Sequence, residues 1–221
     1  VVESILVILN RIGGLVAGAF IDGHMVGTLI GMPGEYKGEA IQWSCRLAVD
    51  PVYQNRHIGY QLKCYQQAEC KKAGIPATYW TFDPLLSKNA HFNFNRLGAD
   101  FVGIEANVYP GVHHLNLGPS DRLIVRWDSN AGHRSKHDQA LIRRRAMTFP
   151  AFEKWTAKMP PAFRMAIPDD VVSVSQNDPD RVKTLRKNST ELFTHAFDAG
   201  YQILGLYRDA EVKECYYYFE I

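Results

Sequence analysis

The sequence has almost no excess of charge of either sign. In 221 residues, 25 Lys and Arg stand against 23 Asp and Glu, so the formal net charge is +2. A chain this close to neutral offers no general electrostatic attraction to nucleic acid or to an anionic membrane. It also contains no apolar run long enough to span a bilayer. We therefore expect neither nucleic acid nor a membrane as a partner.

The sequence also has few cysteines and lacks several well-known catalytic motifs. The four cysteines are Cys45, Cys64, Cys70 and Cys215. Their spacing matches neither a metal site nor a redox pair, so we expect no metal ion, no disulfide framework and a reducing, cytoplasmic location. The Gly-x-Ser-x-Gly elbow, the P-loop and the His-Glu-x-x-His zinc motif are absent, which removes the usual signatures of three enzyme classes. The remaining composition, 46% hydrophobic and 22% charged, is typical of a globular domain with room for a small second lobe.

Residues 40–74 predict a strand, a short turn and a helix. Apolar and polar residues alternate over 41–49 with the period of a strand, which places Cys45 on the apolar face as a buried thiol. Asp50-Pro51 ends this strand, because proline cannot donate to the ladder. The period then becomes helical, and Gly74 ends the helix. The expected apolar stripe of that helix is Ile58, Leu62, Tyr65 and Ala68.

The turn between that strand and that helix predicts a phosphate site. The first amides of a helix have no partners within the helix and lie at the positive end of its dipole, so they bind anions. Gly59 lets the backbone approach a ligand closely, and Arg56 supplies a positive charge. From the residues alone, an ordinary strand–helix connection without a ligand stays an open alternative.

The remaining segments predict a mixed α/β domain followed by a smaller C-terminal region. The expected helices are 3–12, 88–97 (capped by Ser87 and ended by Gly98), a basic helix at 137–147 and a helix from Asp178 to Gly200. The last of these has Asp178 as its N-cap and an apolar stripe of Val182, Leu185, Leu192, Phe193 and Ala196. The expected strands are 15–21 and 25–31 (joined by an Asp22-Gly23 hairpin turn), 76–82, 101–108, 122–127, 201–207 and 214–221. Residues 33–39 and 109–121 read as surface loops. We divide the chain into 1–128, a linker with the basic helix at 129–177, and an accessory lobe at 178–221.

The central stretch resembles motif A of the GNAT superfamily of N-acetyltransferases. The matching residues are Leu47, Val49, Pro51, Tyr53, Gln54 and Gly59, and His57 stands where the family usually has its first glycine. The order of predicted elements over roughly 1–128 is similar to the GNAT core from its second strand onward. The run from Trp80 to Gly98 is similar to a poorly characterised branch of predicted acetyltransferases.

The resemblance implies an α/β (α+β) fold. Its sheet is mixed and mostly antiparallel, with a splayed central pair of parallel strands flanked by helices, and a small C-terminal α/β lobe follows. The usual first strand and helix of the family have no counterpart in the sequence. We therefore expect a partner to cover the sheet edge, for which a homodimer is one arrangement.

The resemblance also implies a co-substrate, acetyl-CoA or another acyl-CoA. Its pantetheine arm would pair with the backbone of Leu47 and Val49, and a backbone N–H near Leu47 would polarise the acyl carbonyl. The residues expected to hold the pyrophosphate or the rest of the cofactor are Gln54, Asn55, Arg56, His57, Ile58, Gly59, Tyr60 and Asn89. Asn89 reads equally well as a plain helix cap.

The acid and base of the reaction are less clear. The position of the usual family tyrosine is Phe94, which has no proton to donate. His91, on the same helix, is a candidate because its unperturbed pKa is near neutral, and Asp83 is a second candidate that also reads as a cap before Pro84. Glu39, just before the central strand, is a weaker candidate for the base. Three residues of the 109–121 loop are expected to shape the acceptor pocket: Tyr109, His113 and His114.

Our first interpretation is an enzyme that moves an acetyl group from acetyl-CoA to an amine of a small molecule or peptide. The amine would attack directly in a ternary complex. The alternative is a non-catalytic GNAT-fold module that binds CoA or a partner, which Phe94 and His57 favour. A third interpretation uses the basic run Arg143–Arg145 to bind an acidic partner and predicts a steep salt dependence.

Overall fold

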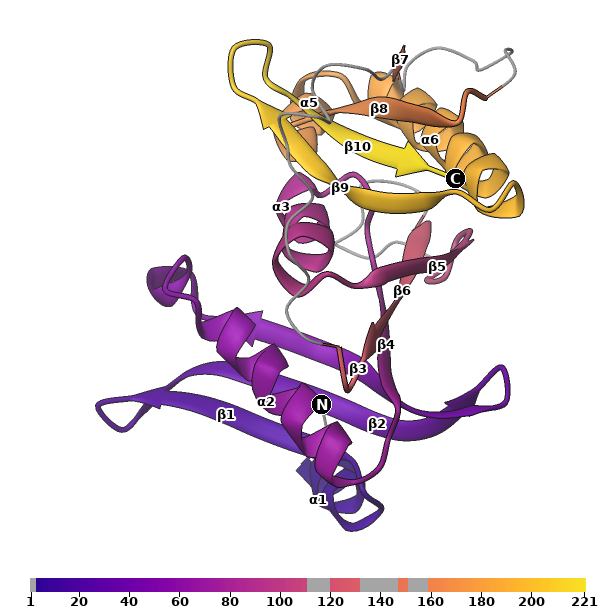
Figure 1. Ribbon diagram of the computed structural model, residues 1–221. Coiled ribbons are helices and arrows are strands. Elements are labelled where there is room, and N and C mark those ends of the chain that lie inside the picture. Colours follow the sequence, from indigo (N-terminus) through magenta and orange to yellow (C-terminus); the bar gives the residue numbers. More distant parts are fainter. Residues whose placement is uncertain (1–2, 111–119, 132–146, 151–158) are drawn as a thin grey trace. The chain divides into compact units, whose positions relative to one another are not determined.

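A computed structural model describes residues 3–110, 120–131, 147–150 and 159–221 (Figure 1). The chain divides into two compact units, one formed by residues 1–80 and 126–132 and the other by residues 81–125 and 133–221. The basic helix expected at 137–147 lies mostly outside the described residues, and the predicted division at residues 128 and 177 stays a prediction.

The first unit consists of most of a six-stranded sheet and two helices. Its elements are α1 (Glu3–Arg11), β1 (Leu15–Ile21), β2 (His24–Tyr36), β3 (Glu39–Val49), the short 3₁₀ helix η1 (Pro51–Tyr53), α2 (Ile58–Lys72) and the first part of β4 (Ala77–Phe82). The strand order of the sheet is β1-β2-β3-β4-β6-β5, in which β6 is Arg122–Asp128 and β5 is Asp100–Glu105. The pairs β1–β2 and β2–β3 are antiparallel, whereas β3–β4 is parallel.

The second strand is longer than the sequence indicates. β2 runs to Tyr36 and pairs with β3 as far as Glu39, so the surface loop predicted at 33–39 is wrong. The turn is reduced to Lys37 and Gly38, whose φ angles of 51° and 79° make a tight hairpin. The sequence pattern did not predict this part of the strand, because Pro33 and Gly34 are residues that normally interrupt strands.

The helix α2 covers one face of the sheet. Its buried Ile58 and Leu62 pack with Val26 and Leu29 of β2. The predicted stripe is only partly right, since Tyr65 is 49% exposed. The buried face continues instead through Lys63, Gln66 and Cys70, three residues that an apolar pattern does not select.

The second unit contains the remainder of β4 and β6, with β5, and a four-stranded sheet. The further elements are α3 (Ser87–Ala90), the π-helix η2 (His91–Leu97), β7 (Met147–Pro150), β8 (Ala162–Pro168), α5 (Val171–Asn177), α6 (Pro179–Asp198), β9 (Gln202–Asp209) and β10 (Glu214–Glu220). The order of the second sheet is β7-β8-β10-β9. Sequence reasoning missed β7 and β8, because Pro150, Pro160, Pro161 and Pro168 border both segments.

Two helices of the second unit test the predicted helix signals with opposite results. α6 confirms its prediction: Asp178 Oδ1 accepts a hydrogen bond from Arg181 N at 3.0 Å as N-cap, and the predicted stripe of Val182, Leu185, Leu192, Phe193 and Ala196 is buried. The helix predicted at 88–97 is wrong in detail, because it is a single α-turn followed by a π-helix. Ser87 does not cap it, and its hydroxyl donates to the Asp169 carbonyl at 2.7 Å.

The fold class agrees with the prediction. A mixed, mostly antiparallel sheet with a central parallel pair and flanking helices is followed along the chain by a smaller region of helices and a second sheet. Within the described residues, no helix is both long enough and apolar enough to cross a membrane.

Candidate functional site

The parallel pair β3–β4 separates shortly after it begins. The two strands pair at Ile41↔Ala77, Gln42↔Thr78 and Trp43↔Tyr79, while β3 continues to Val49. Within the described residues, the edge of β3 that faces β4 therefore has no paired strand beyond Trp43. Free backbone amides and carbonyls along such an edge are available to an extended, amide-containing ligand.

A bulge lies where this separation starts. On the β2 side, the register passes from Ile30↔Arg46 to Gly31↔Ser44, so Cys45 is an extra residue in β3. Cys45 is exposed, and the prediction of a buried thiol is wrong. A uniform alternation cannot survive a bulge, because one inserted residue exchanges the two faces of the strand.

The turn after β3 is held by its own side chains. Asp50 Oδ1 accepts from Val52 N at 2.9 Å and starts η1, and Gln54 Nε2 donates to the Val49 carbonyl at 3.3 Å. Gln54, a predicted cofactor residue, thus fastens the turn to the end of the strand. The Arg56 guanidinium lies 5.2 Å from the centre of the Tyr53 ring, which keeps an exposed positive charge beside the start of α2.

Two left-handed residues shape the entrance to α2. Asn55 has φ 63° and His57 has φ 62°, and His57 is the N-cap of α2 without a side-chain capping hydrogen bond. Residues of alternating handedness turn successive N–H groups toward one point, which makes a concave anion site. We call the backbone of residues 55–60 the cradle. The left-handed φ gives a physical reason why glycine would suit position 57.

Gly59 lies against β3 in the first turn of α2. A Cβ atom built on Gly59 would be 3.7 Å from Val49 Cγ2 and 3.8 Å from Leu47 Cδ2, which is ordinary contact. Leu47 and Val49 are half-buried against the same core. The predicted cofactor positions of β3 and of the cradle therefore lie together in the first unit, whereas Asn89 belongs to the second unit.

Asp83, a predicted base, is held in a buried ion pair of the second unit. Arg186 NH1 donates to Asp83 Oδ1 at 3.1 Å and NH2 donates to Oδ2 at 2.7 Å. Arg122 NH1 is 3.7 Å from the same carboxylate, and Leu85 N donates to it at 3.0 Å. Both carboxylate oxygens are thus occupied by structural partners: Leu85 N makes a local capping contact, and Arg186 adds an ion pair that the sequence did not indicate.

The other candidates of the second unit lie on or near the π-helix. His91 and Asn89 are exposed, and Asn89 N donates to the Leu86 carbonyl at 2.9 Å. Phe94 is 5% exposed and makes edge contacts with the rings of Phe82 and Tyr217. Position 94 is therefore part of an aromatic core.

The predicted acceptor residues are only partly described. Tyr109 is 51% exposed, and the Arg122 guanidinium lies 5.5 Å from its ring centre. His113 and His114 lie outside the described residues. Within the part of the chain that the structure describes, no group of three or more His, Cys, Asp or Glu side chains could hold a metal ion.

Glu39, the weaker base candidate, lies in a polar cluster at the beginning of β3 whose other members the sequence did not indicate. Arg126 binds both Glu39 oxygens, at 2.8 and 3.2 Å, and Tyr79 Oη donates to Glu39 Oε2 at 2.9 Å. The Arg126 hydrogen bonds lower the pKa of Glu39. Burial, and then the bond to Glu39, raises the pKa of Tyr79 to about 12. Glu39 and Tyr79 stay in their ordinary charge states near neutrality, so neither suits a proton transfer there.

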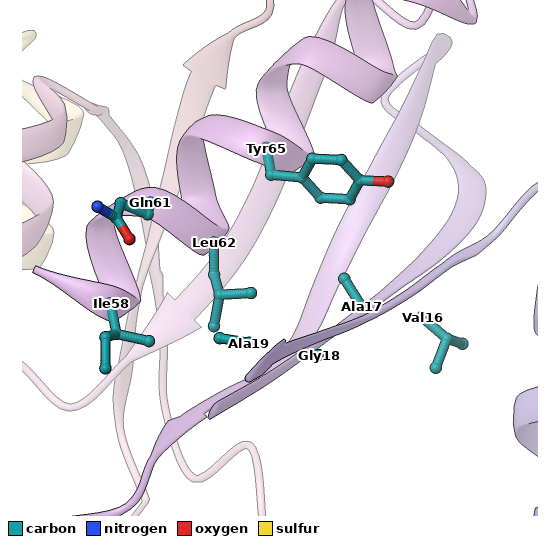
Figure 2. Close-up of a pocket in the computed structure, with 8 residues that line it drawn as sticks. All are labelled: Val16, Ala17, Gly18, Ala19, Ile58, Gln61, Leu62 and Tyr65. Atoms are coloured by element: carbon teal, nitrogen blue, oxygen red, sulfur yellow. The ribbon is translucent and has the colours of Figure 1, made fainter. Parts of the chain in front are cut away.

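A shallow pocket of about 420 Å³ opens between β1 and α2 (Figure 2). It is lined by Val16, Ala17, Gly18, Ala19, Ile58, Gln61, Leu62 and Tyr65. Its walls are apolar or small, with the tips of Gln61 and Tyr65 as the polar groups. It offers room for an apolar group, and its lining contains the Tyr65 phenol but no carboxylate, imidazole, amine or thiol.

No family model and no curated protein matches the chain. Among solved structures, it is similar to a GNAT family acetyltransferase from Elizabethkingia anophelis with acetyl-CoA bound, at 16% identity and TM-score 0.46 over 57% of this chain and 82% of that one. It is also similar to an IAA acetyltransferase from Bacillus cereus, at 14% identity and TM-score 0.45 over 57% and 84%. It is also similar to an aminoglycoside 6'-N-acetyltransferase complexed with coenzyme A, at 15% identity and TM-score 0.44 over 60% of this chain and 81% of that one.

Proposed function

We propose that the chain binds an acyl-CoA on the free edge of β3 and on the cradle, and transfers the acyl group, acetyl in the first instance, to an amine. The observation that supports this most is the adjacency of these two features within one unit. A free strand edge suits the two amides of pantetheine, and it leads directly to a concave set of amides that suits a pyrophosphate.

The transfer step follows from the position of the acyl carbonyl. A backbone N–H of β3 near Leu47 would hold the carbonyl oxygen and stabilise the oxyanion that forms when the amine attacks. The C–N bond forms, the C–S bond breaks, the amine nitrogen loses a proton and the departing CoA sulfur gains one. Of the two predicted acid–base candidates, Asp83 is bound by Arg186 through both carboxylate oxygens, so we do not assign the proton transfer to it.

The direct test is calorimetric titration with acetyl-CoA and with CoA. We expect micromolar affinity, weakened about tenfold in Arg56→Gln because a charge-assisted contact is worth roughly 1–2 kcal/mol. Lys71→Gln is the matched control, since Lys71 lies in the last turn of the same helix and should leave binding unchanged. An absence of binding up to millimolar, or equal losses in both variants, would overturn the site.

A binding module without catalysis is the second candidate. Phe94 favours it, because the resemblance places the usual acid at this position, which here is a phenylalanine in an aromatic core. Thiol release in the presence of a panel of amines separates the two candidates. An enzyme releases CoA thiol with one acceptor class, whereas a module is saturated by CoA and releases none.

A further inference from the structure

A lysine lies fully buried beneath the helix that forms the cradle. Lys63 is 2% exposed, and its Nζ lies 3.6 Å from the centre of the Trp80 ring and 5.9 Å from that of Trp127. Its ammonium donates to Gln66 Oε1 at 2.8 Å, and Gln66 Nε2 donates to Gln42 Oε1 at 2.7 Å. Aromatic faces and neutral amides thus surround the nitrogen.

Among the described residues, no carboxylate lies within 4.0 Å of the Lys63 ammonium to balance its charge. The titratable group nearest in effect is the Cys70 thiol of α2, which shares a contact of 3.6 Å with Thr78 of β4. On β6, the charged neighbours of Trp127 are Arg126 and Asp128, which contact each other.

The surroundings act on the lysine in two opposite directions. Removing an ammonium from water without a counter-charge is costly, and burial lowers the pKa of Lys63 to about 7. The face of Trp80 favours the charged form through a cation–π contact. The amine therefore exchanges its proton near neutral pH, and an added negative charge in the vicinity shifts that balance toward the ammonium.

We propose that Lys63 is a positioning residue for the cradle. Lys63 takes up a proton when an anion binds at the start of α2, and its positive charge then strengthens the binding. The inference rests on the proposed function, because it takes residues 55–60 as the anion site. Lys63 follows Ile58, the first residue of α2, by five residues. At a rise of about 1.5 Å per residue, the two Cα atoms are about 7.5 Å apart along the helix axis. At an effective dielectric of about 20, one charge changes affinity on the order of tenfold at a separation of roughly 10 Å.

A purely structural lysine would behave differently. Such a residue would keep one charge state throughout, and its loss would change stability without changing the protons exchanged on binding. Proton uptake is therefore the measurement that distinguishes the two roles.

The experiment is titration of CoA into wild type and three variants at pH 7.5, in buffers that differ in protonation enthalpy. The dependence of heat on that enthalpy gives the number of protons taken up. We expect the wild type to take up a larger fraction of a proton than Lys63→Met, whose side chain keeps the contact with Trp80. CoA ionisation is common to both and cancels. Lys63→Arg, with a permanent charge, should retain affinity without the extra uptake, and exposed Lys71→Met should match the wild type.

The affinities give a second readout. Lys63→Met should bind CoA about tenfold more weakly than wild type at pH 6, and the difference should shrink by pH 9. Equal proton uptake in wild type and both Lys63 variants overturns this inference alone. Failure of the wild type and Lys71→Met to bind CoA overturns the proposed function together with the inference. If Lys63→Met does not fold, comparison of wild type with Lys63→Arg still decides.

Discussion

The left-handed backbone at His57 predicts an unusual gain in stability on losing a side chain. His57 has φ 62° and ψ 8° at the N-cap of α2, with no capping hydrogen bond from the imidazole. A residue with a Cβ pays about 1–2 kcal/mol in this region. Glycine avoids that cost but loses about 0.5–1 kcal/mol more entropy on folding. We expect His57→Gly to raise the free energy of unfolding by about 0.5–1 kcal/mol.

Two control variants separate the effect of the left-handed backbone on the free energy of unfolding from the effect of the imidazole side chain. His57→Ala removes the imidazole and every contact it makes but keeps the Cβ, so it should not be more stable than the wild type. Asn55→Gly changes the other left-handed residue, which has φ 63°; its gain should be smaller, because asparagine tolerates this conformation. Urea denaturation measures all three, and the expected melting shift for His57→Gly is about 1–4 °C.

The refuting result is clear. If His57→Gly is no more stable than His57→Ala, the left-handed conformation is not the source of strain. Titration with CoA adds a functional readout: an open cradle should bind at least as tightly in His57→Gly as in the wild type. A loss of affinity in both variants would instead make the imidazole a ligand of the phosphate.

Three further predictions concern the buried charges and the cradle. Asp83→Asn should lower the free energy of unfolding by about 3–5 kcal/mol in urea, because it leaves Arg186 buried without its partner; loss of the exposed Arg208 in Arg208→Gln should cost less than about 1 kcal/mol, and similar values for both would contradict this reasoning. Folding lowers the pKa of Lys63 from 10.5 to about 7, so the destabilisation caused by burying its ammonium is complete below pH 7. As the pH rises from 7 toward 10.5, the free energy of unfolding should increase by an amount on the order of 5 kcal/mol. Lys63→Met should flatten the stability–pH curve over that window, and an unchanged slope would count against a titrating lysine. Gly59→Arg should abolish the thermal stabilisation by CoA, because its side chain must pass between α2 and the side chains of β3; a response like that of wild type would place the ligand elsewhere.

Elements with a strong local signal could be predicted from the sequence. The hairpin at Asp22-Gly23 needs only a residue pair that accepts positive φ, and both residues adopt it, at 49° and 79°. α6 needs an N-cap and a regular stripe, and Asp178 and its apolar positions supply both. The turn into α2 was also visible, because proline, glycine and a helical period follow one another there.

The local pattern failed where a distant partner decides the outcome. Cys45 alternates correctly with its neighbours, yet the bulge that exposes it arises from the pairing of β3 with β2. Asp83 reads as a cap before proline until Arg186, 103 residues later, binds both of its oxygens. No window of sequence contains both members of that pair.

The sequence by itself therefore determined that 41–49 forms a strand, that α2 is a helix and that a polar turn joins them, because each depends on neighbours within a few residues. Only the tertiary structure decided what surrounds them: where β4 leaves β3, and that Lys63 lies among Trp80, Trp127 and Gln66 instead of in solvent. The physical reason is that burial, unlike helix or strand period, depends on strands and helices that lie far apart along the chain. A lysine on a helix has the same local signal in both environments, and its pKa is a property of the folded protein.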